Sequence, residues 1–267
     1  NLWGGEGVVY AGVIDGIDML FLDAPHLFDR EGGPYGAHSG PGGDWWDNPQ
    51  RFAALSWVAA RIARAGIVGW KPDVLHAHDW QAGYAPAYLG YGGASGVGSV
   101  ITVHNIAFQG WADAGMIDTL RLPREAFHPG QLEYYGGLSS LKAGLVTADA
   151  ITTVSPTYAA ELMRPEFGMG LEGVIVARAA DVQGILNGVD ETVWSPEVEP
   201  RPYSARRMKG KAASRAALCA EFGLEVPGPL ALLVSRLTDQ KGIDLIPQVV
   251  PEFLRAGGGL VVLSALA

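Results

Sequence analysis

The chain has little of what marks several protein classes. Its 267 residues include a single cysteine, Cys219, so no disulfide can form within the chain. Cys219 lies in a helical pattern, which predicts a packed thiol rather than a reactive one. No apolar run approaches the roughly 20 residues that span a bilayer, so no membrane is expected as a partner. The first residues also lack the basic and apolar parts of a signal peptide, which favours a cytoplasmic protein.

Basic residues are also scarce. The 19 Lys and Arg are outnumbered by 28 Asp and Glu, which leaves a formal charge of −9. This balance argues against nucleic acid as a partner, because that footprint needs a concentrated basic excess. A small anionic ligand is still compatible with it, since a few basic residues can gather in one cleft. No feature of the sequence indicates an oligomeric state.

Hydrophobic residues are plentiful, at 48%, and they fall in runs that predict an α/β protein. Residues 8–14 and 17–22 read as a hairpin around Asp15-Gly16. A long Gly- and Pro-rich loop follows from Ala24 to Trp46, with Tyr35 and His38 among its candidate functional residues. Asn48 is then predicted to cap a helix whose first residue is Pro49.

From Asn48 onward, apolar strand-like runs alternate with helical patterns, which predicts parallel sheets. The segment from Asn105 to Gly137 reads as irregular, and a helix is predicted over 138–147. Three prolines and two glutamates cluster in 194–202 and predict an interdomain connection. We therefore divide the chain into a first domain at 1–190, a linker at 191–203, and the start of a second domain at 204–267.

The stretch from Asp73 to Gln81 carries the densest chemistry. A strand-like run there ends in His76, His78, Asp79 and Trp80, where the carboxyl end of a parallel strand would lie. An imidazole beside a carboxylate and an indole can bind and stack on a sugar ring. His76 and His78 share a strand face, so a metal site is the alternative, as is simple strand-end capping.

Other candidates follow neighbouring elements. His104 and Asn105 end the next strand and offer donors and acceptors to hydroxyl groups, although capping of the strand end is equally compatible. Aromatic residues that can act as carbohydrate platforms, or simply pack, are Trp45, Trp46, Trp80, Trp111, Tyr134 and Tyr135.

Arg236 and Lys241 flank a loop between an apolar strand and a helix predicted to begin near Gly242. Helix N-termini attract anions, and a guanidinium with an ammonium suits a diphosphate leaving group. The competing interpretation is that both are ordinary solvated residues of an exposed loop.

Taken together, these motifs resemble those of bacterial glycogen synthases, the relatives of plant starch synthases. In chain order they are His76-Ala-His-Asp-Trp-Gln81, Thr102-Val-His-Asn-Ile-Ala-Phe-Gln-Gly110, Val154-Ser-Pro-Thr-Tyr158, Glu166-Phe-Gly-Met-Gly-Leu-Glu-Gly173, Gly184-Ile-Leu-Asn-Gly-Val-Asp190 and Val234-Ser-Arg-Leu-Thr-Asp-Gln-Lys-Gly242. The set runs in order over nearly the whole chain.

The resemblance implies a GT-B fold of two Rossmann-like domains, both incomplete here. It also implies retaining transfer of glucose from ADP-glucose to the non-reducing end of an α-1,4-glucan, with no metal and no cofactor. It assigns catalytic roles to Arg236, Lys241, His104 and Asp79. We expect substrate contacts from His78, Trp80, Gln81, Asn105, Asn187 and Tyr134.

The chain also departs from the family pattern. The family's N-terminal Lys-x-Gly-Gly loop and its later Glu-bearing motif are absent, and Ser264 to Ala267 replace a glycine-rich turn. We therefore expect a fragment with little or no transferase activity. The rival hypotheses are another GT-B nucleotide-sugar transferase, a metal hydrolase built on His76 and His78, and a non-catalytic glucan-binding module.

Overall fold

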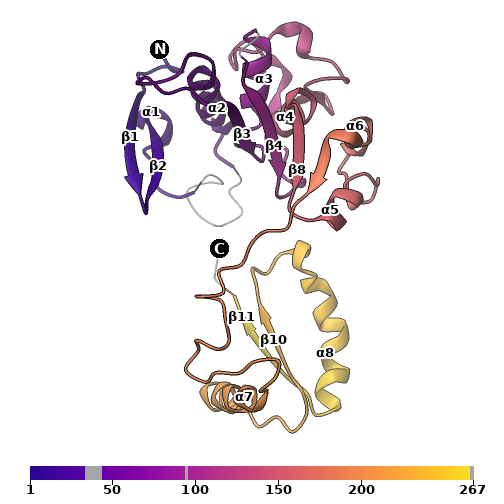
Figure 1. Ribbon diagram of the computed structural model, residues 1–267. Helices are drawn as coiled ribbons and strands as arrows, with labels where there is room; N and C mark the ends of the chain where they lie inside the picture. The colour runs from indigo at the N-terminus through magenta and orange to yellow at the C-terminus, as the bar shows by residue number, and fades with distance from the viewer. Residues whose placement is uncertain (34–43, 94–95, 265–267) are drawn as a thin grey trace. The chain divides into compact units, whose positions relative to one another are not determined.

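The computed structural model describes residues 1–33, 44–93 and 96–264 (Figure 1). The chain divides into two compact units, the first ending at Asn187 and the second beginning at Gly188. Each unit is described by itself below. Tyr35 and His38, named above as candidates, lie outside the described residues.

The first unit begins with the predicted hairpin. Strands β1 (Val8–Ile14) and β2 (Ile17–Asp23) pair antiparallel, and Ile14 faces Ile17 across the turn. Asp15 and Gly16 both have positive φ, 52° and 79°, as a two-residue turn of the tight hairpin type requires. The hairpin prediction is confirmed. The loop predicted after it contains a short helix, α1 (Pro25–Phe28).

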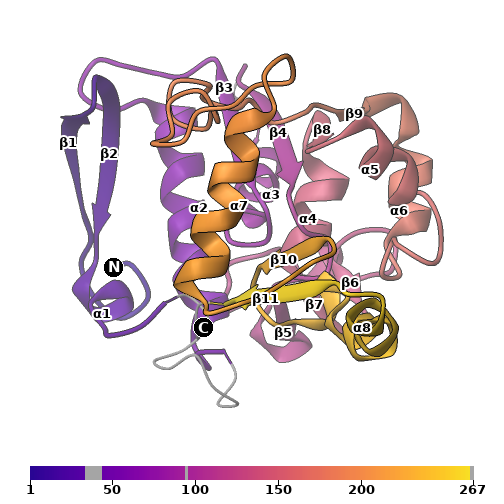
Figure 2. The ribbon, with the colours of Figure 1, turned by 90° about the horizontal axis from the view of Figure 1, so that it is seen from below.

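Helix α2 (Asn48–Ala65) lies beside the hairpin (Figure 2). The prediction that Asn48 caps it is wrong, since the cap position is Asp47 and no side chain bonds there. The Asp47 carboxylate instead accepts two hydrogen bonds of 2.8 Å from the Arg30 guanidinium. The Asp47 carboxylate is therefore engaged in a long-range ion pair with Arg30 and does not cap the helix. Gly66, with φ of 76°, ends it.

A four-stranded sheet forms the centre of the first unit. All its strand pairs are parallel, as predicted, and the order is β3-β4-β8-β9. The strands are β3 (Val74–His78), β4 (Gly98–Val103), β8 (Ala150–Thr153) and β9 (Val182–Gly184). The helices that follow them are α3 (Tyr84–Tyr91), α4 (Ser140–Thr147), α5 (Pro156–Glu161) and α6 (Glu172–Ala177), with the 3-10 turn η3 (Ala179–Asp181).

A second, smaller sheet corrects the prediction for 105–137. Three short strands pair antiparallel in the order β5-β7-β6, and Gly137 to Ser139 are a strand rather than the start of the next helix. The Ser139 hydroxyl then caps α4 by accepting from the Lys142 amide at 3.0 Å. The elements are β5 (Trp111–Asp113), β6 (Glu133–Tyr134) and β7 (Gly137–Ser139), with η1 (Ala114–Met116) and η2 (Arg124–Ala126).

The core of this unit lies around the central sheet and α4. Ile101, Leu141 and Leu145 are fully buried and pack with Ile151 of β8. Full burial of one such side chain contributes about 1.5–3 kcal/mol. Lys142 is buried as well, and its ammonium donates to the carbonyls of Pro129 and Glu133. Burial lowers the pKa of Lys142, while Glu133 opposes the shift. The ammonium therefore ties the segment before β6 to α4.

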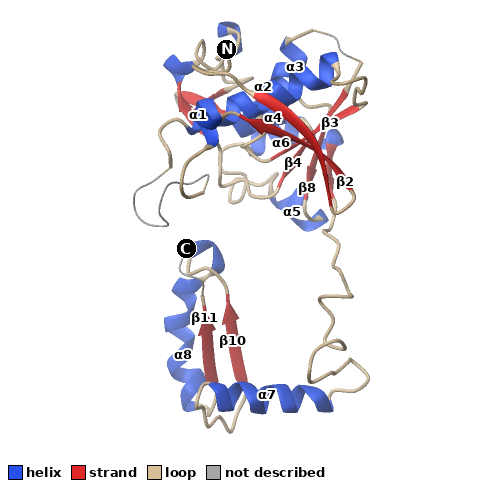
Figure 3. Cartoon of the chain, turned by 90° about the vertical axis from the view of Figure 1, so that its left-hand side faces the viewer, coloured by secondary structure: helices blue, strands red, loops and turns tan. Residues whose placement is uncertain are grey.

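The second unit holds one β-α-β arrangement, with helix α7 (Lys209–Glu221) preceding it. Strands β10 (Leu230–Val234) and β11 (Gly259–Leu263) pair parallel, and α8 (Ile246–Arg255) runs along them (Figure 3). Among the residues from 188 to 264 whose burial the structure describes, Gly259 and Val261 are the buried ones. Cys219, predicted to be packed, is half-buried on α7. Of the helices in the described part of the chain, none combines the length and hydropathy needed to cross a bilayer.

Candidate functional site

Three histidines line up where the strands of the central sheet end. His76 and His78 lie on one face of β3, and their rings stack with centroids 4.3 Å apart. His104 follows β4, and its Nε2 lies 3.0 Å from Nδ1 of His78. At the other end of the row, Nε2 of His76 lies 2.6 Å from Oγ1 of Thr102. The parallel pairing of β3 and β4 therefore joins motifs that are 26 residues apart into one histidine row, His76-His78-His104.

Asp79 holds the loop that carries His104. Its Oδ1 accepts hydrogen bonds from the His104 amide at 2.7 Å and the Asn105 amide at 3.3 Å. The backbone of Asp79 has φ of 52°, a conformation that Asp tolerates better than most residues. Its own amide donates to the Thr102 carbonyl at 2.9 Å. Asp79, at the end of β3, thus holds the end of β4 in position. The sequence analysis did not predict this role.

The protonation of His78 is biased toward the neutral form. Partial burial lowers the pKa of His78, and the neighbouring His76 and His104 lower it further, against the opposing effect of Asp79. Neutral imidazoles offer one donor and one acceptor each, which suits sugar hydroxyls. Within the described residues, no three His, Cys, Asp or Glu side chains are grouped as a metal site would need.

An aromatic pocket of about 650 Å³ lies beside Trp80. Trp80 is buried and packs edge-on against Phe52, with centroids 4.7 Å apart. Gly110, with φ of 60°, approaches the Trp80 ring so closely that a Cβ there would lie 2.6 Å from Cε3. Other aromatic residues in the lining are Trp45, Trp46, Tyr84, Phe108 and Trp111. The predicted platforms Trp45, Trp46, Trp80 and Trp111 therefore share one pocket.

Sequence reasoning missed Phe52 and Phe108 as members of this pocket. The Phe52 side chain reaches Trp80 from α2. Phe108 had a usable signal, since it follows His104-Asn105 by three residues in the same loop. The Asn105 side chain shapes that loop by accepting from the Ala107 amide at 3.0 Å.

The remaining predicted residues of the first unit occupy separate places. Gln81 is half-buried directly after Trp80. Tyr134 is on β6, and its hydroxyl donates to the Met169 carbonyl, which ties β6 to the glycine-rich turn before α6. Burial, Tyr135 and Glu172 together raise the pKa of Tyr134. Asn187 is exposed at the end of the unit, three residues after β9. The described contacts do not bring Tyr134 into the histidine row.

Arg236 and Lys241 belong to the second unit, after the carboxyl end of β10. Both are exposed, and Lys241 lies in the 3-10 turn η4 (Asp239–Lys241). The helical segment predicted to begin near Gly242 starts as the 3-10 turn η5 (Ile243–Leu245), which continues directly into α8 at Ile246. The two cationic side chains, rather than an α-helix dipole at Gly242, are therefore what this loop offers to an anion.

Comparison with known proteins gives concordant matches. The family model described as "Starch synthase catalytic domain" matches residues 3–177. The glycogen synthase of Cereibacter sphaeroides is 71% identical over 265 residues, which is 99% of this chain and 55% of that protein. The glycogen synthase of Paracoccus denitrificans is 53% identical over 99% of this chain and 55% of its own length.

A solved structure agrees with these relatives. The catalytic domain of starch synthase IV from Arabidopsis thaliana, bound to ADP and acarbose, matches with a TM-score of 0.79 and 28% identity. The match covers 97% of this chain and 54% of that one, so the chain spans about half the length of the proteins it resembles. Since the family model covers more than half of its residues, the chain belongs to the starch synthase catalytic domain family.

Proposed function

We propose that this chain forms part of a retaining GT-B glucosyltransferase that moves glucose from ADP-glucose to the non-reducing end of an α-1,4-glucan. In this proposal, residues 1–190 and 204–267 belong to two Rossmann-like domains joined by 191–203. The glycogen synthases among its relatives, and the ADP and acarbose in the Arabidopsis structure, support this choice of substrates. The observation that carries it is the histidine row with Asp79, next in sequence to the aromatic pocket.

The aromatic pocket is proposed to take the glucan acceptor. Sugar rings stack on aromatic faces, and a volume of about 650 Å³ lies in the range of pockets that hold small ligands. Trp46 is 82% exposed and Trp111 is 53% exposed, so both rings present free area to a chain that enters from solvent. Gln81, Asn187 and Tyr134 are proposed as further polar contacts with the substrates.

The histidine row is proposed to hold the donor glucose. His104 contacts its hydroxyl groups, and Asp79 keeps the His104 backbone in place through the 2.7 Å bond to its amide. His78 and Asn105 extend this polar surface. Because the pKa of His78 is lowered, its neutral imidazole can accept as well as donate a hydrogen bond.

Arg236 and Lys241 are proposed to stabilise the departing diphosphate. In the transfer, the bond between glucose C1 and the diphosphate oxygen breaks, and the electron pair leaves with ADP. The acceptor hydroxyl oxygen bonds to C1, and its proton passes to the departing diphosphate. A guanidinium and an ammonium near the diphosphate stabilise the charge that develops there, and no metal is needed for this step.

A chimera tests this proposal. The chain replaces the matching segment of the Cereibacter sphaeroides glycogen synthase, to which it is 71% identical. Radiolabelled ADP-glucose and UDP-glucose are then offered with glycogen as acceptor. We expect transfer from ADP-glucose at a rate near that of the parent enzyme. A folded chimera that transfers glucose only from UDP-glucose, or not at all, would contradict the proposal.

A further inference from the structure

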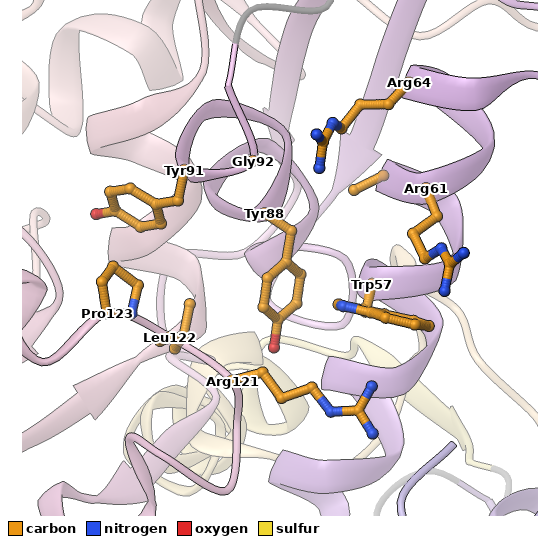
Figure 4. Close-up of a pocket in the computed structure, with 10 residues that line it drawn as sticks. Trp57, Arg61, Arg64, Tyr88, Tyr91, Gly92, Arg121, Leu122 and Pro123 are labelled. Atoms are coloured by element: carbon orange, nitrogen blue, oxygen red, sulfur yellow. The ribbon is translucent and has the colours of Figure 1, made fainter. Parts of the chain in front are cut away.

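Two pockets in the first unit differ in the charged residues that line them. The pocket in Figure 4, of about 400 Å³ between α2 and α3, has Arg61, Arg64 and Arg121 in its lining. The aromatic pocket has two carboxylates instead, Asp44 and Asp113, and no Lys, Arg or His is among the described residues that line it. The aromatic pocket therefore combines indole faces with hydrogen-bond acceptors. The transfer reaction proposed above assigns no role to either carboxylate.

Asp113 shares one face of β5 with Trp111. The two residues are two apart on the strand, so their side chains lie on the same side, while Ala112 between them is buried. The Trp111 ring lies over Gly137, where a Cβ would come within 2.3 Å of its Cε2 and Nε1. Gly137 is also the residue that faces Asp113 across the β5–β7 pair. The missing side chain of Gly137 thus lets the indole lie next to the Asp113 carboxylate.

One oxygen of Asp113 is fixed and the other is available. Oδ1 accepts a hydrogen bond of 2.7 Å from the Gly115 amide, which caps the 3-10 turn η1. No other side-chain hydrogen bond or ion pair joins Asp113 to the described residues. The bond to Gly115 therefore sets the orientation of the carboxylate, and Oδ2 keeps its lone pairs for a donor that enters the pocket.

An indole with a carboxylate beside it matches the two kinds of surface on a pyranose ring. The C–H groups of the sugar stack on an aromatic face, and its hydroxyl groups project around the edge of the ring. Trp111 is 53% exposed, so its ring has free area for such stacking. A carboxylate at the border of that area meets the hydroxyl groups of the stacked sugar. A hydrogen bond to an ionised acceptor is roughly twice as strong as one between neutral groups.

We propose that Asp113 is a specificity-determining residue for the glucan, and that its Oδ2 accepts a hydrogen bond from a hydroxyl of a sugar ring stacked on Trp111. This inference rests on the proposed role of the aromatic pocket and adds the group that recognises the hydroxyls. Trp111 supplies stacking area for any hexose ring, and Asp113 selects rings with a free hydroxyl at the edge. A glucan with methylated hydroxyl groups loses the contact with Asp113.

Calorimetric titration of this chain and of D113N with maltoheptaose, and with its fully O-methylated form, tests the proposal. Asn keeps an oxygen for the Gly115 amide and places an NH2 group where Oδ2 was, so the turn stays capped. We expect D113N to bind maltoheptaose about tenfold more weakly, because one hydrogen bond to a charged acceptor is lost. The methylated glucan has no hydroxyl to donate, so its affinity should be the same for both chains. Equal binding of maltoheptaose by the two chains overturns the proposal.

A matched control and a second variant keep this test independent of folding. D118N alters a carboxylate that is paired with Arg124 outside the pocket, and it should bind maltoheptaose as the unmodified chain does. If D113N fails to fold by circular dichroism, D113S replaces it, because Ser also caps a turn but lacks the second oxygen. Undiminished binding of maltoheptaose by D113S then overturns the assignment.

The same substitution in the chimera separates this inference from the proposed function. We expect the D113N chimera to have a higher KM for maltoheptaose at an unchanged kcat, since Asp113 binds the glucan away from the reacting bond. A D113N chimera with the KM of the unmodified chimera overturns the role of Asp113 and leaves the transferase proposal in place. An unmodified chimera that transfers no glucose overturns both.

Discussion

The two units present the carboxyl ends of their parallel strands in different states. In the first, the ends of β3 and β4 are joined by Asp79, and fully buried residues such as Ile101 and Leu141 lie beneath them. In the second, Arg236 and Lys241 are exposed, and Val234 of β10 is itself 71% exposed. The geometry of the first edge is therefore determined within its own unit. The second edge carries the positive charges of Arg236 and Lys241, and the positions of these exposed side chains depend on the ligand that they bind.

The largest expected effect is on stability. Leu141→Ala should lower the free energy of unfolding of the first unit by about 2–5 kcal/mol, because it leaves a cavity in a closely packed core. Leu232→Ala on β10, where the leucine is 56% exposed, should change stability by only about 0.5 kcal/mol. Urea unfolding followed by circular dichroism measures both. Equal losses would remove the contrast between the units.

The second prediction concerns the cationic edge. In the chimera described above, Arg236→Ala should reduce kcat/KM for ADP-glucose about 100-fold, the order expected when a charge-stabilising donor is lost from a transition state. The control is Arg255→Ala, which removes an arginine from the last turn of α8. Steady-state kinetics compare the two. Unchanged turnover in Arg236→Ala would end the proposed diphosphate role for this residue.

The third prediction tests the bond between the two strand ends. Asp79→Ala removes the acceptor for the His104 and Asn105 amides and should cost about 1–3 kcal/mol of stability. Asp79→Asn keeps an acceptor oxygen and tolerates the positive φ, so it should retain most of the stability. Thermal unfolding measures both variants. An Asn variant as unstable as the Ala variant would show that the charge matters more than the bond.

The smallest expected effect is a pH dependence. Because the pKa of His78 is lowered in the folded chain, the unfolded chain binds the proton first as the pH falls below the ordinary value of 6.5. The stability from neutral His78 is therefore present above pH 6.5 and is lost as the pH falls through the lowered pKa. Melting temperatures between pH 7.5 and 5 should fall less for His78→Gln. His128→Gln, outside the row, is the control and should keep the full dependence.

Much of the fold could be predicted because its signals are local. The turn at Asp15-Gly16 needs two positive φ angles, and those residue types adopt them readily. The apolar runs of β4 and β10 likewise predict strands from the local sequence alone. The predictions that were wrong concern segments whose structure depends on partners distant in the sequence. Arg30 drew Asp47 away from capping α2, and β7 exists only because β5 and β6 pair with it.

The candidate site likewise has features that the local sequence predicts and features that depend on distant residues. His76 and His78 were expected to share a face because strand side chains alternate, and their rings do stack. The positioning role of Asp79 could not be foreseen, because it depends on a positive φ and on a loop 25 residues away. Sequence analysis also did not identify the pocket that is lined by Arg61, Arg64 and Arg121. Arg61 and Arg64 are three apart on one helix, but Arg121 comes from a distant segment.

Gly110 has a consequence for the shape of the aromatic pocket. Its missing side chain lets the Trp80 ring sit back from the aromatic pocket, since a Cβ there would lie 2.6 Å from that ring. A single methyl group at this position would push the indole forward into the space beside it. The depth of the aromatic pocket at Trp80 is thus set by one absent carbon atom.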